Sequence, residues 1–173
     1  MTEHSWHYPD LSRSIAYKKV DRTQNNANSP GVVFLGGLAS DMEGTKAKYL
    51  ENWAKDSGNS FVRFDYTGHG ESSGNFSEGS IASWFQDALS VLDELTTGKQ
   101  ILVGSSMGGW IALLLAKHKP ERVHSLIGIA AAPDFTEDYM WNSFDDKQRQ
   151  KIMEEGFIYQ ESEYSEEPYK ISK

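Results

Sequence analysis

The 173-residue sequence contains no cysteine, which excludes disulfides, thiol catalysis and thiolate metal sites. It also lacks a long apolar run, since the richest one, Trp110–Ala116, is far shorter than the roughly 20 residues of a membrane-spanning helix. Basic residues are few, with 17 Lys and Arg against 25 Asp and Glu, and the net charge of -8 would repel phosphates. We therefore expect no membrane span and no nucleic-acid partner.

The N-terminal residues do not have the pattern of a targeting signal. Met-Thr-Glu-His-Ser-Trp-His is neither an apolar secretory signal nor an Arg-rich transit peptide, so we expect a cytoplasmic protein. The rest of the composition, 38% hydrophobic and 24% charged, is ordinary for a globular protein, and the length favours a single domain over two.

Short β-rich runs alternate with longer helical patterns, which is typical of βαβ units on a parallel sheet. Helices are predicted over Lys46–Asp56, Ile81–Leu95 and Trp110–Ala116, where apolar residues recur at helical spacing or fill the segment. The sequence therefore predicts an α/β fold with a mostly parallel sheet flanked by helices. The predicted strands are Ser14–Val20, Gly31–Leu35, Ser60–Asp65, Gln100–Val103 and Ser125–Ala130.

The sequence changes in character from Pro133 onward, where aromatic and acidic residues mix and no further strand is predicted. Residues 133–169 would take the place of a lid over the site. Two interpretations of its apolar residues stay open, an acyl-pocket lining and ordinary packing. The residues concerned are Trp141, Phe144, Ile152, Met153 and Phe157.

One motif carries the chemistry. Gly104-Ser105-Ser106-Met107-Gly108 has the pattern G-x-S-x-G and lies between an apolar strand and an apolar helix. Such a turn strains the serine backbone and brings other backbone close, so glycines on both sides leave room. A chance glycine-rich turn would not need both flanking elements. We therefore predict Ser106 as a nucleophile at the N-terminus of a helix, where the dipole favours negative charge.

A serine nucleophile needs two N–H donors for the oxyanion of its tetrahedral intermediate. One is expected from the residue after the nucleophile, Met107, and the other from the loop after an earlier strand. That loop is Gly36–Ser40, and Leu38 is the candidate donor, unless the glycines merely turn the chain. No P-loop, dinucleotide fingerprint or metal-ligand spacing appears in the sequence, so we expect neither a cofactor nor a metal.

A third cluster, Phe64–Gly74, follows another predicted strand and carries His69. A histidine here invites a catalytic role, but a histidine whose ring is hydrogen-bonded within its own loop fits the setting better. We place His69 at the rim of the site.

These motifs together resemble the α/β-hydrolase superfamily. They are similar to the mitochondrial palmitoyl-protein thioesterase and acyl-glucuronide esterase group with its bacterial relatives. The similar segments cover most of the chain: Phe34-Leu-Gly-Gly-Leu-Ala-Ser-Asp-Met-Glu-Gly-Thr-Lys-Ala47, Arg63-Phe-Asp-Tyr-Thr-Gly-His-Gly70, Val103-Gly-Ser-Ser-Met-Gly-Gly-Trp110 and Leu126-Ile-Gly-Ile-Ala-Ala-Ala-Pro-Asp-Phe135. The resemblance implies hydrolysis of thioesters or oxygen esters, on small molecules or acylated proteins, through an acyl-Ser106 intermediate. It also implies Leu38 and Met107 as oxyanion donors.

The match breaks at the rest of the catalytic triad, which in this fold follows in the order Ser, acid, His. Two histidines follow Ser106, and neither is expected to reach it. His118 lies at the far end of the helix. His124 comes just before the strand Ser125–Ala130, at the edge of the parallel sheet opposite to the end of the nucleophile's strand. Asp134, directly after that strand, is a fallback acid with no histidine to orient.

The sequence therefore predicts one α/β-hydrolase domain over residues 1–173 that lacks its last strands and has impaired activity. A serine hydrolase that is incomplete in this chain, and a non-catalytic binding module that keeps the fold, are the two functions that remain open. Without a neighbouring strand, Ser125–Ala130 becomes an apolar sheet edge. We expect self-association or a complementing C-terminal fragment as partner.

Overall fold

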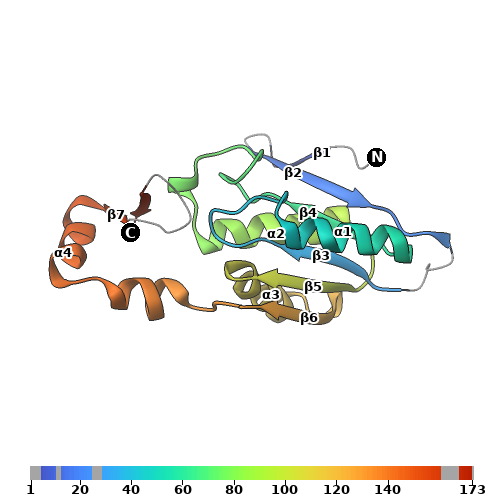
Figure 1. Cartoon of the computed structure of the whole chain (residues 1–173). Helices are drawn as coiled ribbons and strands as arrows, with labels where there is room; N and C mark the ends of the chain where they lie inside the picture. Colours follow the sequence, from blue (N-terminus) through green and yellow to red (C-terminus); the bar gives the residue numbers. More distant parts are fainter. Residues whose placement is uncertain (1–4, 11–12, 25–28, 161–167, 173) are drawn as a thin grey trace. The chain divides into compact units, whose positions relative to one another are not determined.

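The computed structural model describes residues 5–10, 13–24, 29–160 and 168–172, and it divides into two compact units, Met1–Pro133 and Asp134–Lys173 (Figure 1). The first unit contains the sheet and the helices that were predicted from the sequence. The second contains elements that were not.

The first unit is built on a six-stranded sheet with the order β1-β2-β4-β3-β5-β6. The four strands β4, β3, β5 and β6 pair in parallel, while β1 and β2 are antiparallel additions at one side. The predicted mostly parallel sheet is confirmed. The strands are β1 (Ser5–Asp10), β2 (Arg13–Val20), β3 (Gly31–Leu35), β4 (Phe61–Phe64), β5 (Gln100–Ser105) and β6 (Val123–Ile129).

Strand β1 was not predicted, because its residues do not alternate in polarity and Pro9 counts against a strand. The structure places it at the edge of the sheet, where proline is tolerated because its missing N–H is not needed on the outer side.

Three helices cover the sheet: α1 (Thr45–Ser57), α2 (Ile81–Leu95) and α3 (Met107–His118), with short turns η2 (Phe76–Glu78) and η3 (Pro120–Arg122). All three predicted helices are confirmed. Strands β3 and β4 are buried at every residue, as central strands covered on both faces must be. Figure 1 shows α1 in front of the sheet, with α2 and α3 on the other side. In the sheet, β4 lies on one side of β3 and β5 on the other, so the crossovers from β3 to β4 and from β4 to β5 run in opposite directions. Because both crossovers are right-handed, their helices lie on opposite faces of the sheet.

The second unit has its own short elements, so the expectation of no further strand after Pro133 is wrong. Strands β7 (Phe157–Gln160) and β8 (Tyr169–Ser172) pair in an antiparallel sheet of two, after the π-helical turn η4 (Thr136–Trp141) and helix α4 (Asp146–Glu155). Each strand is four residues long, too short for an alternating pattern to be recognised in the sequence.

The apolar residues of this unit form a small core of their own. Phe144, Ile152 and Ile158 are buried together, and Trp141 packs against them. Met153 is 56% exposed. For Phe144, Ile152 and Trp141 the structure therefore shows ordinary packing. The lid role of residues 133–169 stays a prediction, as does the assignment of the whole chain to a single domain.

Strand β6 ends the six-stranded sheet, and among the described strands it pairs with β5 alone. Most of its residues are half-buried or exposed, and Ile127 is 52% exposed. An apolar edge with unpaired N–H and C=O groups is a template for pairing with another chain.

We therefore expect the purified 173-residue chain to self-associate, and Ile127→Lys to reduce this because a charge blunts an apolar edge. Light scattering across a concentration series would measure it. Tyr49→Lys, at an exposed position on α1, is the matched control and should change nothing. A wild-type chain that stays monomeric at every concentration would contradict the prediction.

Candidate active site

Ser106 occupies the sharp turn between β5 and α3, with φ 53° and ψ -121°, and its residue is exposed. A non-glycine residue at positive φ is strained, and the surrounding backbone holds this one in place. The Ser106 N–H donates to the Ile129 carbonyl at 3.0 Å, while its carbonyl accepts from Gly109 N at 2.9 Å and Ala132 N at 3.2 Å. Hydrogen bonds of both the N–H and the carbonyl of Ser106 therefore connect the turn to the last residue of β6 and to the segment just after it.

The glycines around Ser106 are required by close backbone packing. A Cβ on Gly108 would overlap the carbonyl oxygens of Leu35 and Gly36, and one on Gly104 would overlap the Gly108 carbonyl. A Cβ on Gly109 would collide with the Ala131 side chain. The first turn of α3 can therefore lie against the end of β3 only because these positions have no side chain.

Replacing Gly108 by Ala should destabilise the fold by about 2–4 kcal/mol, because the clash is with backbone that cannot move aside. Gly44→Ala is the control: it meets nothing closer than 3.7 Å and has an ordinary φ of -61°, so only about 0.5–1 kcal/mol of N-cap preference is lost. Urea unfolding of both variants measures the difference. Equal midpoints would show that the turn relaxes freely.

The loop after β3 lies directly beside the serine. A Cβ built on Gly37 would be 3.4 Å from Ser106 Cβ and 3.5 Å from the Ser105 carbonyl oxygen. Leu38 is the next residue, and Ala39 follows at φ 55°. The structure thus places the loop that carries Leu38 beside Ser106, which is followed by Met107 at the start of α3.

The far end of this loop is held by buried charges on and after β4. Asp65 accepts the Met42 N–H at 2.6 Å and the Glu71 N–H at 2.9 Å, and burial raises the pKa of its carboxyl group. Arg63, only 3% exposed, binds Glu51 of α1 and Glu43 of the loop. Burial alone would raise the pKa of Glu43, but hydrogen bonds from Lys18, Arg63 and Lys48 lower it to about 2.

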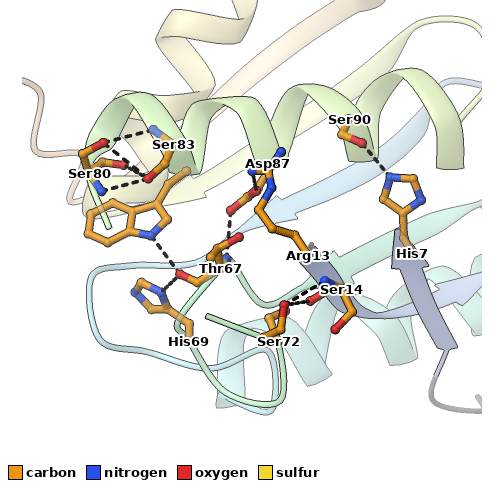
Figure 2. Close-up of polar contacts among 12 residues, drawn as sticks. His7, Arg13, Ser14, Thr67, His69, Ser72, Ser80, Ser83, Asp87 and Ser90 are labelled. Atoms are coloured by element: carbon orange, nitrogen blue, oxygen red, sulfur yellow. Dashed lines mark hydrogen bonds and ion pairs between the residues drawn. The ribbon is translucent and has the colours of Figure 1, made fainter. Parts of the chain in front are cut away.

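Both ring nitrogens of His69 have a partner. Nε2 accepts the Ala39 N–H at 3.1 Å. Nδ1 lies 3.3 Å from the Thr67 carbonyl oxygen, a contact that Figure 2 shows. The ring is surrounded edge-on by Tyr66, Phe76 and Trp84, with centroids 5.1–5.7 Å away. His69 is therefore a hydrogen-bonded loop histidine at the rim of the site, and its Nε2 is not available as a base for Ser106.

Burial lowers the pKa of His69 below its ordinary 6.5, because the apolar surroundings disfavour the charged ring; the Thr67 hydrogen bond opposes this shift. In the unfolded chain the His69 ring takes up a proton near pH 6.5, whereas in the folded chain it stays neutral until the pH is lower. The free energy of unfolding should therefore fall as the pH drops from 6.5 to the folded pKa.

Urea unfolding between about pH 8 and pH 5 should show this loss in the wild type and a smaller loss in His69→Gln, which cannot titrate. His124→Gln, at an exposed position on β6, is the control and should follow the wild type. Identical pH slopes in all three chains would contradict the assignment.

The two histidines that follow Ser106 lie away from it, as expected from the sequence, and the fallback acid Asp134 belongs to the other unit. His118 ends α3, about 17 Å along the helix from Met107, and His124 is the second residue of β6, whose far end pairs with Ser105. Asp134 is exposed, at φ 53°, and begins the second unit. Within the described residues, the Ser106 hydroxyl has no hydrogen-bonded side-chain partner.

Sequence reasoning missed the buried carboxylate of Asp87, which binds the loop that carries Thr67 and His69. Asp87 of α2 is fully buried and accepts from Arg13 of β2 at 2.9 Å and from the Thr67 N–H at 2.8 Å (Figure 2). Trp84 donates to the Thr67 carbonyl at 3.0 Å. The sequence did contain a signal, because Asp87 lies next to Ala88–Leu89 on the apolar face of this helix. A carboxylate in such a position is rarely buried unless it is paired, so a buried partner could have been predicted.

The described part of the chain contains no group of three or more acidic, His or Cys residues placed to hold a metal ion. None of the helices in that same part is long and apolar enough to cross a membrane.

Comparison with known proteins decides the family. Residues 30–157 match the family model of the alpha/beta hydrolase fold. The chain belongs to the alpha/beta hydrolase family. The predicted fold class is thereby confirmed.

Individual relatives confirm the narrower resemblance. The human mitochondrial palmitoyl-protein thioesterase ABHD10 is 42% identical over 159 residues, which are 92% of this chain and 50% of that protein. The crystal structure of a putative hydrolase from Agrobacterium vitis S4 has a TM-score of 0.88 at 39% identity and covers 99% of this chain and 68% of its own. Mouse alpha/beta hydrolase domain-containing protein 10 has a TM-score of 0.85 at 36% identity over 98% of this chain and 66% of its own. This hydrolase chain spans about half the length of the curated relatives that it matches.

Proposed function

We propose that this alpha/beta hydrolase chain carries the nucleophile and the oxyanion donors of a serine esterase or thioesterase, with an acyl intermediate on Ser106. The observation that carries the proposal is the position of Ser106. It is exposed and at positive φ, it precedes the first turn of α3, and the Gly36–Ser40 loop lies against it. A nucleophile elbow has this geometry.

The chemistry assigned to each residue follows from its backbone. The Ser106 Oγ attacks the carbonyl carbon of the substrate, and the N–H groups of Met107 and Leu38 stabilise the resulting oxyanion. Met107 begins α3, and Leu38 follows Gly37, which packs against Ser106; the N-terminus of α3 adds the positive end of the helix dipole. An acyl-Ser106 ester forms as the alcohol or thiol departs.

The substrate class is proposed from the relatives. The human relative is named as a mitochondrial palmitoyl-protein thioesterase. We propose carboxylic esters or thioesters, on small molecules or acylated proteins, as substrates of the site. The cytoplasmic location stays a prediction, which cell fractionation would check.

The general base is the missing part of this proposal. Among the described histidines, none is hydrogen-bonded to Ser106, and a serine without its base loses on the order of 10⁶-fold in rate. We therefore expect very slow turnover of short-chain p-nitrophenyl esters by this chain, and faster turnover when a C-terminal segment supplying an acid and a histidine is added. The non-catalytic binding module is the other outcome.

A fluorophosphonate probe, which reacts with activated serines, separates these outcomes. We expect labelling of the purified chain to be lost in Ser106→Ala and kept in Ser105→Ala, the neighbouring hydroxyl on β5. Mass spectrometry of the tryptic peptide identifies the labelled residue. No labelling of the wild type, with or without the added segment, would favour the binding module.

A further inference from the structure

The β3–α1 loop has one contact that the mechanism above does not use, between the Ala39 N–H and His69 Nε2 at 3.1 Å. Ala39 has a left-handed backbone at φ 55°, which a residue with a Cβ adopts only when other contacts hold it there. It directly follows Leu38, and Gly37 on the other side packs against Ser106. The hydrogen bond from the Ala39 N–H therefore fixes the Leu38–Ala39 peptide, which adjoins the peptide that carries the Leu38 N–H.

We infer that His69 is a positioning residue: its neutral ring accepts the Ala39 N–H and holds the Gly36–Ser40 loop in the conformation that presents the Leu38 N–H to the oxyanion. This inference rests on the proposed function of Ser106.

The ring is well suited to this role. Because Nε2 accepts a hydrogen bond, the proton of the neutral ring is on Nδ1, which then donates to the Thr67 carbonyl. Thr67 is held in turn by its N–H to Asp87 of α2 and by the Trp84 indole on its carbonyl (Figure 2). The ring is 4% exposed. A chain of hydrogen bonds thus runs from the buried carboxylate of Asp87 to the loop.

The aromatic contacts of His69 offer a rival explanation, in which the ring only fills space between Tyr66, Phe76 and Trp84. Two variants distinguish the two roles, because they separate shape from hydrogen bonding. His69→Phe keeps an aromatic ring but has no acceptor. His69→Gln loses the ring, but its side-chain oxygen can reach the position of Nε2 and accept from Ala39.

The first measurement is the rate at which the fluorophosphonate labels Ser106. Positioning predicts that His69→Phe labels at least about tenfold more slowly, while His69→Gln stays within about threefold of the wild type. Space-filling predicts the reverse order, with Phe close to the wild type and Gln impaired. That reverse order would overturn the inference.

The second measurement is amide hydrogen exchange at Ala39 with ¹⁵N NMR of the His69 ring, and it does not depend on Ser106 chemistry. The wild type should show a protected Ala39 amide and a proton on Nδ1; His69→Gln should keep the protection and His69→Phe should lose it. An unprotected Ala39 amide in the wild type, or a proton on Nε2, overturns the inference even if neither variant folds. A wild type that is not labelled even when the C-terminal segment is added overturns the proposed function instead, and the exchange result then decides the role of His69 alone.

Discussion

The close approach of helix α3 to the end of strand β3 is the constraint on which the rest of the site depends. Gly108 lies so near the Leu35 and Gly36 carbonyl oxygens that a methyl group there would overlap them. This approach forces the chain to turn at Ser106 within one residue, at positive φ, and leaves its side chain exposed at the edge of the sheet. The strain at Ser106 is tolerated because hydrogen bonds with Ile129 and Ala132 hold its peptide groups.

The residues that end β4 hold the opposite side of the site. Arg63 and Asp65 are buried charged groups, and each binds the loop near Met42, while His69 binds it at Ala39. Burying charged groups is costly unless they are paired, and Arg63 is paired with Glu51 and Glu43. The β3–α1 loop is held at Met42 and at Ala39, and Gly37 in its first part lies against Ser106.

Strand β6 lies between the site and the outer edge of the described six-stranded sheet. Its last residues bond to the Ser106 peptide, and its outer edge carries exposed Ile127. The matched part makes up 68% of the Agrobacterium vitis chain and 50% of the human relative. The close contacts and backbone hydrogen bonds described above for Ser106 and the Gly36–Ser40 loop are with other residues of Met1–Pro133.

The sequence by itself determined the parallel sheet, the three helices and the turn at Ser106, because these are encoded locally. Apolar periodicity marks Ile81–Leu95, and G-x-S-x-G stands between a strand and a helix. Only the tertiary structure decided that His69 accepts from Ala39, that Asp87 links Arg13 to Thr67, and that β1, β7 and β8 exist. The two hydrogen-bond partners of Asp87 are 20 and 74 residues away from it in the sequence, and Ala39 is 30 residues away from His69. No local sequence pattern specifies pairings over such separations.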